Sequence, residues 1–188
     1  MTRDADQTKA KLLRAAIEEF AAFGIAGARV DRIAASASIN KQMIYAYFGS
    51  KDELFDAVFS DHVAHFLDDV DFDAADLPAY AGRMFDKFED DPALLRLSTW
   101  YRLERPHGKG LSAVVTVNQV RLEKIREAQE SGTVSSEFGS VQLLSLIQAT
   151  ATSWATMNPE FAESIPANRD ERRRTVVEAV RRLVTDPR

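Results

Sequence analysis

The segment Asp31–Lys51 reads DRIAASASINKQMIYAYFGSK, and it decides the fold that we predict for the whole chain. Its pattern indicates two short helices joined by a tight turn, followed by the start of a third helix. We expect the first helix from about Val30 to Ser36 and the second from Lys41 to Phe48. Asn40 stands directly before the second helix, where its side-chain oxygen can accept from the first free amides.

The residues after Phe48 indicate that the second helix ends there and that a new helix begins. Gly49 suits the left-handed conformation in which many helices end. Ser50 and Glu53 have the spacing of a capping box, in which each side chain satisfies a free amide at a helix start.

The second helix has two different faces. Ile44 and Phe48 are four residues apart and can join a small core. The other face carries Lys, Gln and Tyr, and no acid occurs from Arg32 to Lys51. Because Gln can bond adenine bidentately and Lys can reach guanine, this face suits the major groove of DNA. We predict that the base-reading residues are Lys41, Gln42, Met43 and Tyr45.

The stretch Ala15–Val58 resembles the N-terminal domain of the tetracycline-repressor-like (TetR) regulators, above all through Ile44-Tyr45-x-Tyr47-Phe48-x-Ser50-Lys51. The resemblance implies a homodimeric, ligand-responsive transcriptional regulator, usually a repressor, with a variable helical C-terminal domain. Residues 1–50 would form the helix-turn-helix DNA-binding domain, and residues 51–188 the ligand-binding and dimerisation domain.

The head departs from the family pattern in its turn. Ser38 stands where the family usually has Gly, and a non-Gly residue tolerates a positive φ less well, so we expect a strained or differently shaped turn. We expect DNA phosphates to be held by Tyr47 and Lys51, and further by Arg29 and Arg32.

Composition and charge limit the classes of protein. The 188 residues are 45% hydrophobic, without Cys and without an apolar run that could span a membrane, and the polar N-terminus lacks the apolar core of a signal peptide. A cytoplasmic protein is therefore expected. The net charge is −5, but residues 1–51 carry +3, residues 52–91 carry −11 and residues 92–188 carry +3. Only the groove-facing surface must be positive, because phosphate attraction is screened within about 10 Å.

Sparse glycine and recurring helical spacing predict an all-α fold of about nine helices. The first helix should run from Asp6 or Gln7 to Phe23, with Gly24 past its end. Further helices are expected at residues 50–70, 76–89, 91–104, 111–131 and 139–158 and near the C-terminus, with a loop at Pro106–Gly110.

The last two helices are the predicted dimer interface. Gly139–Asn158 contains no charge, yet nine of its twenty residues are Ser, Thr, Gln or Asn, which argues against a membrane span and for a helix covered on several sides. Such helices can pair with their symmetry mates in a four-helix bundle, or they can close the core of a monomer. The interface candidates are Leu143, Ile147, Trp154, Val176, Val177, Val180, Leu183 and Val184.

Large apolar side chains gather in the central helices, where a ligand pocket is expected. The pocket candidates are Met84, Phe85, Phe88, Leu97, Trp100 and Tyr101. They favour an aromatic, moderately hydrophobic effector, although each ring taken alone is better explained by an ordinary core. His62 and His65 are three residues apart and could share a metal, but a helix with an acidic outer face explains both, so we predict no metal site and no cofactor.

No catalytic residue is predicted, because the chain has no phosphate-binding glycine loop, no Gly-x-Ser-x-Gly and no His-Glu-x-x-His. We predict a non-enzymatic, ligand-responsive regulator that binds a palindromic double-stranded DNA operator as a homodimer and is released by a small molecule in its C-terminal body. The alternative is a ligand-binding or adaptor dimer whose DNA-binding head is degenerate.

Overall fold

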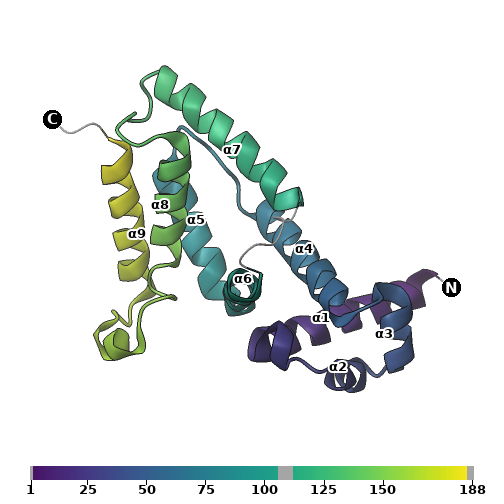
Figure 1. Cartoon of the computed structure of the whole chain (residues 1–188). Helices are drawn as coiled ribbons and strands as arrows, with labels where there is room; N and C mark the ends of the chain where they lie inside the picture. The colour runs from purple at the N-terminus through teal and green to yellow at the C-terminus, as the bar shows by residue number, and fades with distance from the viewer. Residues whose placement is uncertain (1, 106–111, 186–188) are drawn as a thin grey trace. The chain divides into compact units, whose positions relative to one another are not determined.

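The structure, a computed structural model, describes residues 2–105 and 112–185 (Figure 1). Within these ranges it contains nine α-helices, one 3-10 helix and no strand, which confirms the all-α prediction. The predicted loop Pro106–Gly110 lies outside the described residues. The chain divides into two compact units, which are described separately: unit 1 is the described part of Met1–His65 and Pro92–Leu111, and unit 2 that of Phe66–Asp91 and Ser112–Arg188.

Unit 1 contains the predicted head and two later helical segments. Its helices are α1 Thr2–Gly27, α2 Val30–Ala37, α3 Lys41–Phe48, the part of α4 Lys51–Asp69 up to His65, and α6 Pro92–Glu104. α1 packs on both α2 and α6. The largest fully buried side chains of this unit are Phe20, Ile33, Ile44, Leu54, Phe55, Leu94 and Leu97. Unit 1 therefore has an apolar core of its own, to which α4 and α6 contribute.

The predicted bounds and caps of α3 are confirmed. Asn40 accepts the amide of Gln42 at 2.8 Å, and Gly49 follows the helix with a φ of 74°. At the start of α4, Ser50 Oγ accepts the amide of Glu53 at 3.1 Å and donates to its carboxylate at 3.0 Å. These short-range signals predicted the local structure because both partners lie within a few residues of each other.

The predicted end of the first helix at Phe23 is confirmed, because the helical backbone breaks at Gly24, where φ is 70° and ψ is −179°. A short further helical segment follows the break to Gly27 and is included in α1. Glu104 of α6 accepts the amides of Ile25 at 3.0 Å and Ala26 at 2.8 Å just after this break. A carboxylate far along the chain therefore satisfies backbone donors next to the break in α1.

The turn between α2 and α3 has the left-handed shape that its position requires, in spite of Ser38. Ser38 has a φ of 57° and a ψ of 42°, and it is the non-glycine residue with positive φ in the described chain. The amide of Ile39 donates to Ala34 O at 3.0 Å, which closes the turn. The turn thus keeps its geometry with a serine in a conformation that is unfavourable for L-residues.

Unit 2 is a helical layer around α5 Leu77–Asp90. α5 packs against α8 Ser140–Thr152 and α9 Arg169–Val184, and α7 Ser112–Glu130 packs on α8. The 3-10 helix η1 Pro159–Ser164 lies in the segment between α8 and α9. The predicted helix at residues 139–158 ends earlier, at Thr152, so Trp154 lies in a turn, where its indole N–H donates to Arg172 O at 3.2 Å.

Ion pairs fasten α9 to α5. Arg169 bonds Asp90 at 2.7 Å, and Arg173 bonds Asp86 at 2.7 Å. These ion pairs and the apolar residues of α9 together occupy the inner face of α9 within a single chain. Among the described residues no helix is long and apolar enough to cross a membrane.

Candidate nucleic-acid interface and effector cavity

α3 is held by one buried side chain and presents most of its others to solvent. Ile44 is 1% exposed and anchors the helix in the core of unit 1. Met43, Tyr45 and Tyr47 are 40%, 42% and 71% exposed, so three large side chains with apolar surface are accessible on one short helix. All four predicted base-reading residues, Lys41, Gln42, Met43 and Tyr45, lie on this exposed surface.

Lys41 has an acidic neighbour that the sequence analysis did not consider. Its Nζ lies 2.8 Å from Asp31 Oδ1 of α2 and 5.9 Å from the centre of the Tyr45 ring. The hydrogen bond between them raises the pKa of Lys41 and lowers the pKa of Asp31. Both groups are exposed, so solvent weakens the pair, and DNA phosphates can compete for the lysine.

Two of the four predicted phosphate contacts are engaged inside unit 1. Arg32 pairs with Glu19 at 2.6 Å and lies 4.3 Å from the centre of the Phe23 ring. Lys51 Nζ donates to Ala26 O at 3.1 Å and to Ala28 O at 3.2 Å. Both cations therefore have partners that hold the end of α1 and the start of α2.

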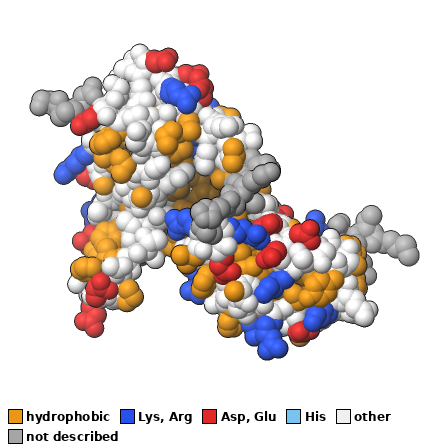
Figure 2. All heavy atoms as spheres, viewed as in Figure 1, with side chains coloured by type: hydrophobic (Ala, Val, Ile, Leu, Met, Phe, Trp, Pro, Cys, Tyr) orange, Lys and Arg blue, Asp and Glu red, His pale blue; other side chains and the backbone are white. Residues whose placement is uncertain are grey.

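The other two phosphate candidates are accessible. Tyr47 is the most exposed large apolar side chain of the described chain, and Arg29 is exposed directly before α2. Figure 2 shows Lys and Arg side chains next to hydrophobic ones over unit 1, with acidic groups among them. The accessible groups on α3 and at the start of α2 combine hydrogen-bond donors with apolar surface, which is the chemistry of a DNA contact.

Glu19 organises the base of this surface. It is 8% exposed and accepts from the Arg29 amide at 2.8 Å and from Arg32 Nε at 2.8 Å. Burial raises its pKa, but the hydrogen bonds from Arg32 and Arg29 outweigh burial, so that the pKa of Glu19 lies below its ordinary value. Glu19 thus remains a carboxylate that fixes the start of α2.

The six predicted pocket residues are divided between the two units. In unit 1, Leu97 is buried, Trp100 Nε1 donates to Ala21 O at 3.3 Å, and the ring of Tyr101 lies 5.0 Å from that of Phe59. In unit 2, the buried residues are Met84 and Phe85, and the ring of Phe88 lies 5.0 Å from that of Phe66. The ring contacts of Tyr101 and Phe88 thus each lie within one unit.

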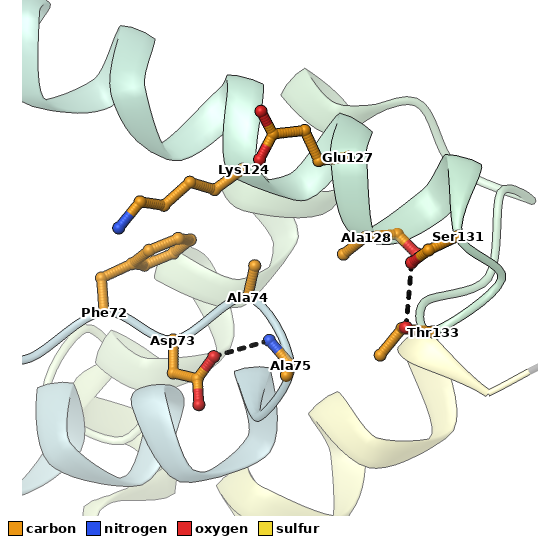
Figure 3. A pocket seen from close by; sticks show the side chains of 9 residues that line it. All are labelled: Phe72, Asp73, Ala74, Ala75, Lys124, Glu127, Ala128, Ser131 and Thr133. Carbon is orange, nitrogen blue, oxygen red and sulfur yellow. Dashed lines mark hydrogen bonds between the residues drawn. The ribbon is translucent and has the colours of Figure 1, made fainter.

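A cavity that is largely open to solvent lies within unit 2, between the segment before α5 and the C-terminal half of α7. It has a volume of about 420 Å³. Its walls are formed by Phe72, Asp73, Ala74, Ala75, Lys124, Glu127, Ala128, Ser131 and Thr133. In Figure 3, Lys124 extends toward the Phe72 ring, whereas Asp73 bonds the amide of Ala75. None of the six predicted pocket residues lines this cavity.

The sequence contained no signal for the cavity. Its walls come from two segments about 50 residues apart, and neither segment has a motif that points to a ligand. A sequence signal did exist for the ion pair between Asp31 and Lys41, because Asp31 lies at the start of the helix that precedes α3.

The predicted dimer residues mostly face inward. Leu143, Ile147, Val176 and Val180 are at most 1% exposed within a single chain, so they cannot themselves meet a partner. The reading of these four residues is corrected: they form the core of unit 2. Partial exposure remains for the other four candidates, Trp154, Val177, Leu183 and Val184.

Among the described residues, no group of three or more metal-binding side chains has the arrangement of a metal site. His65 Nδ1 lies 2.7 Å from Asp61 O of the preceding turn. This contact within one helical turn gives Nδ1 of His65 a partner, the backbone carbonyl of Asp61.

Comparisons with known proteins agree with the geometry of the head. Residues 12–58 match the bacterial regulatory proteins of the tetR family, and residues 76–182 match the tetracyclin repressor-like C-terminal domain. The chain is 36% identical over 192 residues to the HTH-type transcriptional repressor SCO4008 of Streptomyces coelicolor, which covers 97% of each protein.

Solved structures show the same fold. The crystal structure of SCO4942 from Streptomyces coelicolor, described as a transcriptional regulator, has a TM-score of 0.84 and 37% identity, covering 96% of this chain and 99% of that one. FadR of Bacillus subtilis, solved with stearoyl-CoA, has a TM-score of 0.68 at 17% identity over 92% and 97% of the two chains, which shows the fold alone. The matched families and these relatives are regulators rather than enzymes. The chain therefore belongs to the tetR family of bacterial regulatory proteins, and it is a transcription regulator that binds DNA through a helix-turn-helix head.

Proposed function

We propose that the chain acts as a homodimeric repressor that reads a palindromic operator through α3 and is released by a small-molecule effector in unit 2. The observation that supports this proposal most is the surface of α3, where six of eight side chains are exposed and only Ile44 is buried. A helix held by one anchor, with Lys, Gln, Met and Tyr outward, offers base-reading groups without disturbing the core.

The roles within the head follow from the contacts. Gln42 and Lys41 are the proposed readers of base edges, and Met43 and Tyr45 are suited to apolar contact with thymine methyl groups. Tyr47 and Arg29 are the leading phosphate contacts because both are exposed. The main role of Arg32 and Lys51 is to stabilise unit 1 through their internal partners, and contact with DNA phosphates is a secondary role.

The dimer would form through the outer face of α8. The segment Gly139–Asn158 carries no charge, and Val141 and Leu146 are 57% and 37% exposed on it. Over the part of unit 2 that carries α8 and α9, Figure 2 shows hydrophobic side chains set in largely uncharged surface. An uncharged, partly apolar helix face is the kind of surface that two copies can bury isologously. Two heads in one dimer can then read half-sites about 34–36 Å apart.

DNA binding is tested by fluorescence anisotropy on DNA from upstream of the chain's own gene and on scrambled DNA, across a salt series. Selective binding that weakens steeply with salt is expected. Gln42→Ala should relax the preference at one operator position, whereas Gln119→Ala, which removes an exposed glutamine of α7, should change nothing. Asp31→Asn should tighten binding, because it removes an acid 2.8 Å from Lys41. If the operator lies elsewhere in the genome, selection of bound sequences from random DNA should identify it. Weak and equal binding to all DNA sequences would refute the base-reading role of α3.

Dimer formation is tested separately by analytical ultracentrifugation. Leu146→Glu places a charge on the uncharged face of α8 and should yield monomers. Val120→Glu, at a residue 53% exposed on α7, is the matched control and should leave the dimer intact. If the Leu146→Glu protein sediments as the wild type does, the dimer interface does not lie on this face of α8.

A further inference from the structure

Unit 2 contains a buried cation, Arg121, for which the described residues provide no anionic partner. Arg121 of α7 is 4% exposed, and its Nε is buried without a hydrogen-bond partner among the described residues. Its guanidinium lies 5.3 Å from the centre of the Tyr80 ring and 5.5 Å from that of Phe72. Cation–π contacts return only part of the hydration that a buried guanidinium loses, so the charge remains incompletely compensated.

Tyr80 of α5 is the second unsatisfied group at the same place. Its side chain is fully buried, and its hydroxyl has no hydrogen-bond partner within the part of the chain that the structure describes. Burial raises the pKa of Tyr80, which keeps the hydroxyl protonated as a donor, and burial lowers the pKa of Arg121. The hydroxyl can donate and accept, whereas the guanidinium can only donate. Among the described residues neither the Tyr80 hydroxyl nor Arg121 Nε has a hydrogen-bond partner, so both have a donor available for an added acceptor.

Phe72 contacts both of these groups and also lines the cavity. Its ring meets the Tyr80 ring edge-on with centroids 4.8 Å apart, and its centre lies 5.5 Å from the Arg121 guanidinium. Phe72 is also one of the residues that line the 420 Å³ cavity (Figure 3). Lys124 follows Arg121 by one helical turn and supplies a second cation to the cavity wall. The cavity wall also carries two carboxylates, Glu127 and Asp73, and the Asp73 carboxylate accepts the Ala75 amide at 2.8 Å (Figure 3).

We propose that the effector of this regulator is a small organic oxyanion, a carboxylate or phosphate on an apolar body, bound by the Arg121 guanidinium and the Tyr80 hydroxyl. Lys124 attracts the anion at the cavity mouth, and displacement of the Phe72 ring admits its charged end to Arg121. The guanidinium fork matches either oxyanion in two parallel hydrogen bonds. This inference rests on the proposed release of the repressor by a small molecule, and it names the chemical class of that molecule.

The test uses benzoate, phenyl phosphate and inorganic phosphate as probes, with neutral benzamide as the uncharged counterpart, at constant ionic strength set with chloride. Binding to the full chain is measured by calorimetry and by the shift in Tm. At least one oxyanion should bind and raise Tm while benzamide does not, and the comparison of phenyl phosphate with benzoate decides between the two oxyanions. Arg121→Gln should raise the Kd about 30-fold or more. Arg126→Gln, which removes an exposed cation of the same helix, should leave it unchanged.

Tyr80→Phe is a second variant, and it keeps the proposal testable if the Arg121→Gln protein does not fold. It removes only the unpartnered hydroxyl, so the free protein should keep its Tm, and the Kd for the oxyanion should rise about 5–10-fold. Equal binding of the oxyanions by wild type, Arg121→Gln and Tyr80→Phe would overturn the proposal. So would the failure of all three oxyanions to bind the wild type.

Anisotropy on operator DNA separates this inference from the proposed function. Oxyanion binding that depends on Arg121 but leaves DNA binding unchanged would support the site and refute effector release. Sequence-selective DNA binding by a chain that ignores every oxyanion would refute the site and leave the repressor proposal standing. Release of DNA from wild type, but not from Arg121→Gln, would support both.

Discussion

Replacing Gly24 by Ala should destabilise unit 1 far more than the loss of one glycine's flexibility implies. The residue has a φ of 70° and a ψ of −179°, a region that only glycine occupies readily. A Cβ added there would lie 2.6 Å from Glu104 Oε1 and 2.9 Å from two carbons of Trp100. The variant therefore meets a backbone penalty and a steric penalty together.

The two penalties can be estimated separately. Backbone strain of this kind costs about 1–3 kcal/mol. Overpacking costs another 1–3 kcal/mol or so. Ala also reduces the conformational entropy of the unfolded chain relative to Gly, which offsets about 0.4–1 kcal/mol of the loss in stability. The carboxylate cannot simply move away, because it accepts the amides of Ile25 and Ala26. We expect a net loss of about 2–5 kcal/mol, which lowers Tm by roughly 6–14 °C in a chain of this size.

Gly132→Ala is the matched control for the backbone part alone. Gly132 has a φ of 74°, and a Cβ there would meet nothing within 4 Å. Its loss should stay below about 1.5 kcal/mol. Thermal and urea unfolding of both variants measure the difference. In a Trp100→Ala background, the cost of Gly24→Ala should shrink, because the ring that it strikes is gone. Equal losses for Gly24→Ala and Gly132→Ala would refute the steric argument.

Three further outcomes are expected. Asn40→Ala should cost about 1 kcal/mol in urea unfolding, since it removes the 2.8 Å cap at the start of α3, while Asn40→Asp should keep most of it. Ile147→Ala should cost about 2–5 kcal/mol, because the side chain is 0% exposed, whereas Val120→Ala, at a 53% exposed position, should change stability by about 0.5 kcal/mol or less. The folded state holds the pKa of Glu19 below its ordinary value of 4.5, so its contribution is fully present above about pH 4.5 and is lost as the pH falls through the folded value. The stability gap between wild type and Glu19→Gln should therefore narrow on acidification; a gap that stays constant from neutral to acid pH would contradict this origin.

The sequence by itself determined the head. The cap by Asn40, the pairing of Ser50 with Glu53 and the burial of Ile44 all involve partners within one or two helical turns. Such signals can be read from spacing alone, because a helix fixes the relative positions of residues three and four apart. The exposed face of α3 followed from the same periodicity, so the base-reading candidates could be named before the structure was known.

Only the tertiary structure decided which apolar faces are covered and which charges are paired. Helical spacing marked Ile147 and Val180 as apolar, but it could not say whether the same chain or a second copy buries them; α5 covers both within one chain. The bond from Glu104 to Ile25 joins residues 79 positions apart. The isolation of Arg121 likewise depends on which rings other segments bring to it. Local propensity acts over a few residues, whereas burial and charge pairing are properties of the packed chain, and these decide where a ligand or a partner can bind.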